Sequence, residues 1–182
     1  RIICCGRPLY EYGFLETARK RLEDILETLN RSVGRGIPVV GLEPACVSVF
    51  RDELRELFPG NADARKLSEN VYSLSEFLHR RARHFPMPKL AKRALAHMHC
   101  NHKAILGMDS DKALLDAMNL DCNILDGGCC GMAGSFGYHK EKYDVSLQAG
   151  ERVLLPAVRQ SDKDTLIIAD GYSCREQIKQ ET

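Results

Sequence analysis

The segment 127–134, of sequence GGCCGMAG, contains a Cys-Cys-Gly triplet that occurs a second time in the chain. The two triplets are Cys129–Gly131 and Cys4–Gly6. A short loop of glycine, tyrosine and phenylalanine follows each triplet, and apolar residues at steps of three and four then predict a long helix. We therefore interpret the chain as one structural module present in two copies.

A short apolar strand is predicted after the long helix in both copies. Residues 37–42 and 165–169 are continuous apolar runs, which are typical of strands that are covered on both faces. Each strand stops at a turn that holds one cysteine, Cys46 in the first copy and Cys174 in the second, and a helix is predicted after each cysteine. The order of elements is therefore the same in both copies.

The second copy also has an upstream half. A strand over 94–99 ends at Cys100, a short helix follows around 109–118, and a strand over 121–125 runs into the cysteine pair. Because strands and helices alternate, we expect an α/β fold of two pseudo-repeated Rossmann-like lobes with parallel sheets. The first copy begins three residues before its cysteine pair, so we expect its lobe to be truncated at the N-terminus, without one strand, one helix and one cysteine.

Three regions are predicted along the chain. Residues 1–60 form the first, incomplete Cys-Cys-Gly module, residues 61–90 form a helical connector, and residues 91–182 form the second module. Inside the connector, Ser73 and Glu76 have the spacing of a capping box at a helix start. Two prolines, Pro86 and Pro88, are expected to end that helix.

The composition restricts the class of protein. With 26 basic and 25 acidic residues the net charge is +1, which argues against a nucleic-acid partner. No apolar run reaches the roughly 18–20 residues of a membrane-spanning helix. The first residues enter a cysteine motif at once, so no secretion signal is expected. The eight cysteines are partly arranged in adjacent pairs, which favours a metal or redox role in the cytosol over a disulfide framework.

Four cysteines of the second copy are the candidate ligands of a metal centre: Cys100, Cys129, Cys130 and Cys174. Each follows the end of a predicted strand, and ligand sites in parallel sheets lie outside the carboxyl ends of the strands. Four thiolates suit either an iron–sulfur cluster or tetrahedral zinc. A thiolate at Cys174 is further favoured by the nearby start of a helix. The alternative interpretation is that the four are buried structural thiols.

The first copy retains Cys4, Cys5 and Cys46, which are three candidate ligands. Three thiolates hold a metal poorly or leave a coordination position open, so we expect this site to be empty or partly formed. Cys122 lies inside a predicted strand and has no counterpart in the first copy. We therefore predict that Cys122 is a core residue.

Ionisable residues surround Cys100 in the sequence. His97, His99 and His102 lie within three positions of it, and Lys103 follows. His99 either binds at the site or packs at the end of the strand. Lys103 either balances the charge of the thiolates or is solvated.

The segment 128–137 resembles the signature of the cysteine-rich CCG domain family. That family includes the CCG-containing component of heterodisulfide reductase, the iron–sulfur components of glycolate oxidase and of anaerobic glycerol-3-phosphate dehydrogenase, and lactate-utilisation proteins. Residues 151–159 and 169–178 are similar to the C-terminal end of large fused D-2-hydroxyacid dehydrogenases, and so is the first copy over 4–10 and 41–46. Those enzymes join an FAD-binding domain to ferredoxin-like and CCG domains.

The resemblance implies a function in electron transfer. In such enzymes the CCG domain passes electrons from a reduced flavin toward a quinone or another acceptor. FAD would be bound only by parent domains that are absent from these residues, so the chain, as a fragment of an FAD and iron–sulfur oxidoreductase, is not expected to be catalytic alone. The implied partners are the flavin-binding and ferredoxin-like domains, and the implied location is the cytoplasm, peripheral to the respiratory membrane in the parent enzyme.

The cofactor is left open by two departures from the family pattern. The family closes each module with Cys-x-x-Cys, but here Val49 follows Cys46 and Gln177 follows Cys174 at the second cysteine position. The five-cysteine set of the noncubane cluster is therefore absent, and a 4Fe–4S cluster or zinc remains. The alternative function is a zinc-stapled or metal-free docking domain, and the lack of Cys-x-x-Cys argues against thiol–disulfide exchange. We also expect an unpaired sheet edge in the first lobe to favour a homodimer.

Overall fold

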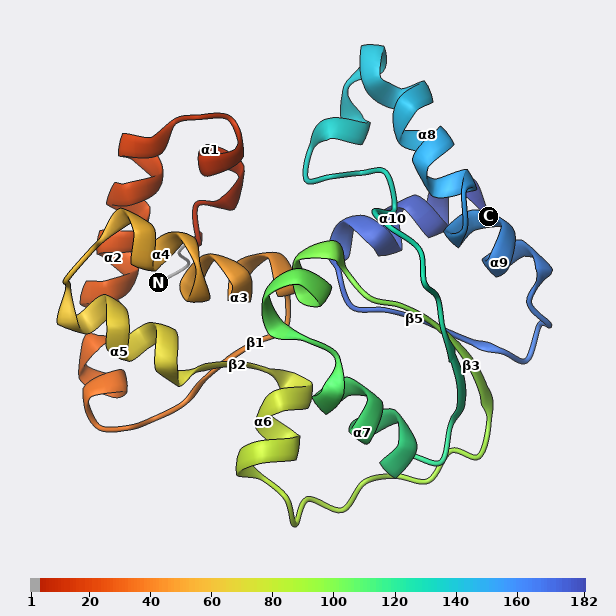
Figure 1. Ribbon diagram of the computed structural model, residues 1–182, viewed down its shortest axis with the longest axis horizontal. Coiled ribbons are helices and arrows are strands. Elements are labelled where there is room, and N and C mark those ends of the chain that lie inside the picture. Colours follow the sequence, from red (N-terminus) through yellow and green to blue (C-terminus); the bar gives the residue numbers. More distant parts are fainter. Residues whose placement is uncertain (1–3) are drawn as a thin grey trace. The chain divides into compact units, whose positions relative to one another are not determined.

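The computed structural model describes residues 4–182, so the expected entry of residues 1–3 into the first cysteine motif lies outside the described part. The fold is mixed α/β, with many helices and two small parallel sheets of two and three strands (Figure 1). The chain divides into two compact units, Arg1–Phe77 and Leu78–Thr182. Within residues 4–182, no helix has the length and apolar composition that crossing a membrane requires.

The first unit packs helices around a two-stranded parallel sheet. Its core joins Leu22 and Ile25 of the long helix to Leu54 and Leu67 from two shorter helices, and this confirms the apolar periodicity read from the sequence. The elements are α1 (Arg7–Glu11), α2 (Leu15–Gly34), β1 (Val39–Gly41), α3 (Pro44–Arg51), α4 (Glu53–Leu57), α5 (Ala62–Asn70), β2 (Val71–Ser73) and the first half of α6 (Leu74–Arg81), which spans the boundary between the units. Strand β1 pairs with β2 from Val39↔Val71 to Gly41↔Ser73.

Strand β2 is an element that the sequence prediction missed. The segment 61–90 was expected to be a helical connector, but β2 lies between α5 and α6 and completes the sheet of the first unit. The predicted capping box is confirmed, since Glu76 N donates to Ser73 Oγ at 3.2 Å and Ser73 N donates to Glu76 Oε2 at 3.0 Å. The module boundaries at residues 60 and 90 stay predictions.

The second unit is built on a three-stranded parallel sheet with the order β4-β3-β5. Its elements are β3 (Arg93–His97), η1 (His102–Leu106), α7 (Asp109–Ala117), β4 (Asp121–Ile124), η2 (Phe136–Tyr138), η3 (Lys140–Lys142), α8 (Tyr143–Glu151), α9 (Leu154–Gln160), β5 (Leu166–Ala169) and α10 (Tyr172–Glu181). Ala96 of β3 is level with Ile124 of β4, and His97 is level with Ala169 of β5. The three strands therefore end at the same edge of the sheet.

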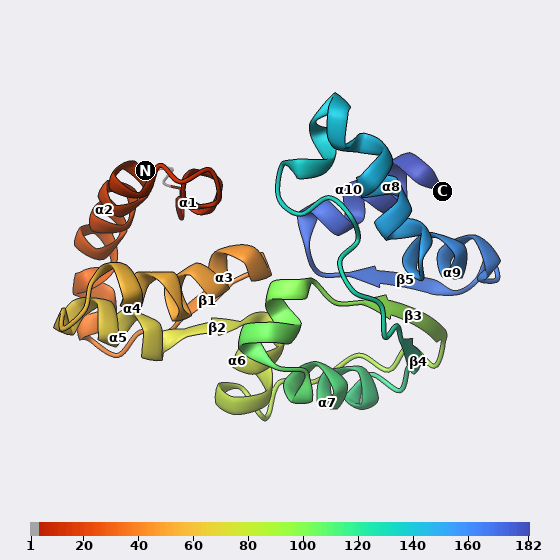
Figure 2. The ribbon, with the colours of Figure 1, turned by 45° about the horizontal axis from the view of Figure 1, so that its top comes forward.

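Helices cover both faces of this sheet. Helix α7 lies on one side, and α8, α9 and α10 lie on the other (Figure 2). Because successive residues of a strand face opposite ways, Leu95 joins the core with Leu154 and Leu155 of α9, while Ala94 and Ala96 join the core on the α7 side. The prediction of burial on two faces was made for the strands at 37–42 and 165–169, and it is wrong for both, since β1 and the edge strand β5 are only partly buried. The central strand β3 is the one that is buried on both faces.

The long helix predicted over 143–158 is interrupted. Helix α8 ends at Glu151 and α9 begins at Leu154, with Val153 in a non-helical conformation between them. Pro156 explains the interruption, because proline has no N–H to donate to the carbonyl of Arg152 and its ring clashes with a continuous helix. The break lets α9 direct Leu154 and Leu155 into the core.

Candidate metal centre

The second Cys-Cys-Gly triplet forms a tight turn that depends on glycine. Gly131 has a φ of 104°, and a Cβ at this position would overlap the backbone carbonyl of Ser146. The N–H of Gly131 donates to Cys129 Sγ at 3.3 Å. The first triplet repeats this turn, since Gly6 has a φ of 83° and its N–H donates to Cys4 Sγ at 3.5 Å. The two triplets thus share one local backbone structure.

The structure brings the four cysteines of the second copy together. The thiol of Cys129 lies close to the thiols of Cys100 and Cys130, and the thiol of Cys130 also lies close to that of Cys174. Cys130 and Cys174 are buried, while Cys100 and Cys129 are half-buried. Their loops leave the common edge of the sheet after β3, β4 and β5, which is where sequence reasoning expected them to meet.

The contacts among the thiols lower the pKa of two of the four cysteines and raise the pKa of the other two. Hydrogen bonds from Cys100 and Cys130 hold the pKa of Cys129 far below its usual range. The hydrogen bond from Cys130, helped by His97, lowers the pKa of Cys174 to about 6 against the effect of burial. Their proton-donating role, together with burial, raises the pKa of Cys100 and of Cys130. Cys129 and Cys174 are therefore the sulfurs that carry negative charge most readily.

The donor set fits a metal centre by chemistry and by position. Thiolate sulfur is the preferred ligand of iron–sulfur clusters and a common ligand of zinc. Within residues 4–182, no three Cys, His, Asp or Glu side chains surround a common point in metal-ligand geometry, and the four sulfurs contact one another in series. A bound centre therefore has to separate these sulfurs and replace the protons that they share.

A buried histidine and two carboxylates hold the edge of the sheet beside the cysteines. His102 Nδ1 lies 2.7 Å from Asp170 Oδ2, and its Nε2 lies 2.8 Å from Asp111 Oδ2. Asp170 also accepts from the N–H of His99 at 2.7 Å. Because Asp170 follows β5 and His99 follows β3, this carboxylate links the loops that carry Cys174 and Cys100.

The charges of this network reinforce one another. Burial opposes protonation of His102, but the hydrogen bonds to Asp111 and Asp170 outweigh it and raise the pKa of His102 to about 10. Burial likewise acts to raise the pKa of Asp170, yet the hydrogen bonds from His102 and His99 hold it below its usual value. Sequence reasoning noted His102 only as a neighbour of Cys100 and missed both carboxylates, since 68 positions separate His102 from Asp170.

The other basic residues around Cys100 have distinct surroundings. His99 packs against Gly171, and its Nδ1 accepts from the N–H of Asn101 at 3.1 Å. His97 is 2% exposed, stands beside Cys174, and has no hydrogen bond of good geometry from either ring nitrogen in the described part of the chain. Lys103 donates to the carbonyl of Gly127, so it anchors the loop that leads to the cysteine pair.

The first unit brings its thiols together around an arginine. Cys5 Sγ and Cys46 Sγ lie 3.1 Å apart, and Cys4 is exposed. Arg7 donates to Ala45 O at 3.3 Å and to Ser48 Oγ at 2.7 Å, and it forms an ion pair with Glu53. Sequence reasoning missed Arg7, whose only signal was its place directly after the triplet. That this three-thiol site is empty or partly formed stays a prediction.

Cys122 is separate from both clusters of thiols. It lies in β4, where it is partly buried and packs against the core on the α7 side of the sheet, at the margin of the core to which it was predicted to belong. Burial raises the pKa of its thiol. It therefore provides a control position for experiments on the other cysteines.

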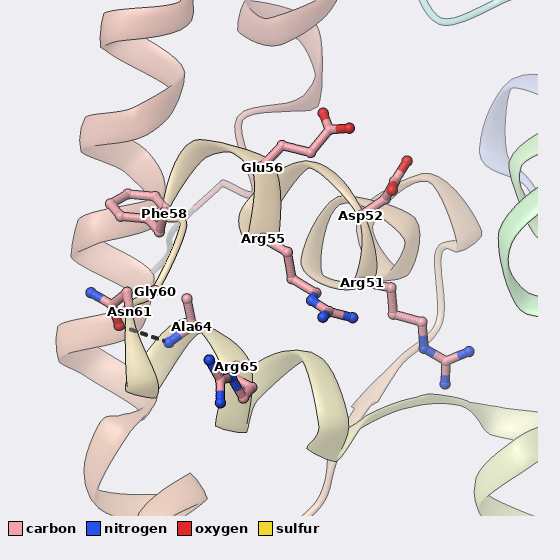
Figure 3. Close-up of a pocket in the computed structure, with 9 residues that line it drawn as sticks. All are labelled: Arg51, Asp52, Arg55, Glu56, Phe58, Gly60, Asn61, Ala64 and Arg65. Carbon is pink, nitrogen blue, oxygen red and sulfur yellow. Dashed lines mark hydrogen bonds between the residues drawn. The ribbon is translucent and has the colours of Figure 1, made fainter.

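A cavity of about 350 Å³ lies on the first unit, away from its thiols (Figure 3). Its lining mixes charges of both signs, including Arg55 and Arg65 with Asp52 and Glu56. A third arginine, Arg51, is already paired with Glu76 at 2.6 Å. The lining therefore lacks a single-sign set of groups that would select a charged ligand.

The chain is similar to parts of two dehydrogenases and to a lactate utilization protein. It is 31% identical to one of the subunits of anaerobic glycerol-3-phosphate dehydrogenase of Escherichia coli over 98% of the chain and 46% of that protein, so it spans about half the length of this relative. It is 30% identical to lactate utilization protein A of Bacillus subtilis over 85% of the chain and 71% of that protein. D-2-hydroxyglutarate dehydrogenase of Haemophilus influenzae matches at 27% identity over 96% of the chain and 18% of its own length. No family model and no solved structure matches the chain.

Proposed function

This chain belongs to the cysteine-rich CCG domain family that includes lactate utilization protein A and the matching component of anaerobic glycerol-3-phosphate dehydrogenase, and we propose that it is the electron-transfer part of a flavin-linked dehydrogenase. The observation that carries the proposal is the contact of the Cys100, Cys129, Cys130 and Cys174 thiols at one sheet edge. An iron–sulfur cluster bound there supplies reversible one-electron oxidation and reduction.

Each of the four cysteines has a role in the proposed centre. Cys129 and Cys174 supply the sulfurs that ionise most readily, and Cys100 and Cys130 complete the set when they lose their protons. The buried positions of Cys130 and Cys174 keep water from half of the ligands, whereas Cys100 and Cys129 face the half-buried side. Electrons would enter or leave through that more accessible side.

The two units are proposed to be copies of one Rossmann-like module. The shared turn at Gly6 and Gly131 supports this view, as do the parallel strands in each unit and the position of Cys46 and Cys174 in the first turn of a helix after a strand. In this proposal the second unit holds the metal centre, and the first unit, with Cys4, Cys5 and Cys46, holds an incomplete version of it.

The parent enzyme would oxidise a small hydroxylated substrate with a flavin. The names of the relatives support this, since they include a component of a glycerol-3-phosphate dehydrogenase and a D-2-hydroxyglutarate dehydrogenase. The proposed partners are therefore an FAD-binding domain or protein and a ferredoxin-like domain, with FAD held by the partner. Because one relative is named as part of a larger enzyme, its name supports an assembly of several chains or domains.

The metal and sulfide content of anaerobically purified protein tests this proposal. We expect about four iron atoms and about four acid-labile sulfides per chain, as a 4Fe–4S cluster held by four thiolates requires. Cys129→Ser should lose the iron, and the control Cys122→Ser should keep it because Cys122 packs at the margin of the core, away from the site. About one zinc per chain would identify a metal-stapled docking domain instead. Wild-type protein without metal would contradict the electron-transfer function and would leave the metal-free docking domain.

A further inference from the structure

His97 is a buried side chain with two polar ring nitrogens at the edge of the three-stranded sheet. It is the last residue of β3, it is 2% exposed, and neither Nδ1 nor Nε2 makes a hydrogen bond of good geometry with any residue in 4–182. Burying an unsatisfied polar group costs about 1–3 kcal/mol, so native structures rarely leave one without a reason. The ring nitrogens of His97 are therefore expected to have a hydrogen-bond partner in the functional form of the site.

The neighbouring histidines show that the lack of partners is specific to His97. His102 is hydrogen-bonded through both ring nitrogens to Asp111 and Asp170, and His99 Nδ1 accepts from the N–H of Asn101. All three side chains are buried at the same edge of the sheet. Only the ring of His97, among these three, has both nitrogens left over.

The position of His97 directs it toward the candidate metal centre. It lies two residues after Leu95 on β3, so it faces the same side of the sheet, which is the side covered by α8, α9 and α10. Cys174 lies in the first turn of α10, and the His97 ring stands beside its thiol. The Cys174 sulfur of a bound centre would therefore be within reach of the His97 ring as a hydrogen-bond acceptor.

Two roles are open to an imidazole in this place, and the surroundings distinguish them. A histidine that binds a metal directly nearly always donates its second ring N–H to a carboxylate, a carbonyl or water. The described residues offer His97 no such second partner. A single hydrogen bond to sulfur needs only one ring N–H, so the surroundings favour a donor over a ligand.

We propose that His97 donates a hydrogen bond to the sulfur of Cys174 in the bound centre and thereby raises the reduction potential of that centre. The inference rests on the proposed function and adds a positioning residue to it. A hydrogen bond to a ligating sulfur withdraws negative charge from the cluster, and this favours the reduced, more negative state. His97 thus sets how readily the centre accepts an electron from its donor.

The test is a redox titration of anaerobic full-length protein followed by electron paramagnetic resonance. It compares wild type, His97→Phe and His97→Gln, with the exposed His84→Phe as control. We expect all four to hold the same iron and sulfide. His97→Phe should shift the midpoint potential to a more negative value, His97→Gln should return it toward wild type because glutamine restores an N–H donor, and His84→Phe should leave it unchanged.

The outcomes separate this inference from the proposed function. An unchanged potential in His97→Phe with full iron content would overturn the role of His97 and leave the electron-transfer function intact. Loss of iron in both His97 variants would overturn the hydrogen-bond role in favour of direct ligation. A wild-type protein without iron would overturn the electron-transfer function and the inference that rests on it.

Discussion

At the scale of single residues, the turn that carries Cys129 and Cys130 requires glycine at position 131. Its φ of 104° and the carbonyl of Ser146 leave no room for a side chain. We predict that Gly131→Ala lowers the free energy of unfolding by more than about 2 kcal/mol, because steric overlap adds to the backbone cost of about 1–2 kcal/mol. Urea denaturation followed by circular dichroism measures this, with metal content read in parallel.

Gly13 provides the matched control for that substitution. It also has a positive φ, 79°, but a Cβ there would meet nothing within 4 Å. Gly13→Ala should therefore show only the backbone cost of about 1–2 kcal/mol and should retain metal. If both variants lost the same free energy of unfolding, steric overlap with Ser146 would not be the reason for glycine at position 131.

The lowered pKa of Asp170 predicts how low pH changes the stability of the second unit. Its pKa is lower in the folded state, so its stabilising effect is present above the ordinary Asp pKa of about 3.9 and is lost as the pH falls below that value. Asp170→Asn should cost about 1.5–3 kcal/mol at pH 7, the worth of hydrogen bonds to a charged group. Urea denaturation of metal-free protein should show the difference between the two proteins shrinking as the pH falls through the lowered pKa of Asp170. A difference that stays constant as the pH falls below the ordinary Asp pKa would contradict this account.

These residues show what was predictable at this scale. The convergence of Cys100, Cys129, Cys130 and Cys174 was expected from the rule that parallel strands end at one edge, and the three strands do end level at one edge. The Asp111–His102–Asp170 network was not predictable, because no periodicity or spacing relates three residues that meet only through the fold. Arg7 was missed for the same reason, since its partners lie about 40 positions away.

At the scale of elements, the pair of Arg51 and Glu76 connects α3 to the start of α6. Two hydrogen bonds of 2.9 and 2.6 Å join the side chains, and Arg51 also donates to Val71 O of β2 at 2.9 Å. Glu76 is 1% exposed. We predict that Glu76→Gln costs about 3–5 kcal/mol, because removing one charge leaves the other buried and unpaired. Urea denaturation of the first unit measures the loss.

An exposed pair of the same kind serves as the comparison. Arg159 bonds Glu151 at 2.9 and 2.7 Å, but both side chains are exposed to solvent by more than a third. Arg159→Met should therefore cost much less than Glu76→Gln, because exposed ion pairs contribute little to stability. If both substitutions lowered the free energy of unfolding equally, burial would not explain the contribution of the Arg51–Glu76 pair to stability.

The elements also show where prediction from sequence ends. The strands before Cys100 and Cys174 were predictable because each contains a short apolar run that stops just before its cysteine turn. Strand β2 was missed because it has only three residues, Val71–Ser73, between two helices, and its pairing with β1 is a tertiary contact. The helix over 143–158 was predicted as continuous because its apolar periodicity carries through the break that precedes Pro156.

At the scale of the whole molecule, each unit has its own hydrophobic core. The cluster of Leu22, Ile25 and Leu54 is formed entirely by the first unit. The clusters around Leu155 and Ala96, on the two faces of the three-stranded sheet, are formed entirely by the second. A unit with its own core can unfold as its own cooperative transition, so changes in one unit need not alter the other.

This division leads to a prediction about metal removal. The four thiols of the proposed centre all belong to the second unit, so a metal bound there stabilises that unit and not the first. Calorimetry of anaerobic protein should show two transitions, and a chelator should lower the midpoint of one of them by about 10 °C or more. Glu76→Gln should lower the other, which identifies it as the first unit.

The pattern of shifts would locate the metal within the chain. If chelation lowered the transition that Glu76→Gln also lowers, the metal would belong to the site of Cys5 and Cys46, where the Sγ–Sγ distance is 3.1 Å. If chelation lowered both transitions, each module would hold a metal, and the first site would not be the empty or partly formed one expected from its three cysteines. A shift confined to the second unit would mean that the metal is held by the set of Cys100, Cys129, Cys130 and Cys174, and not by Cys4, Cys5 and Cys46.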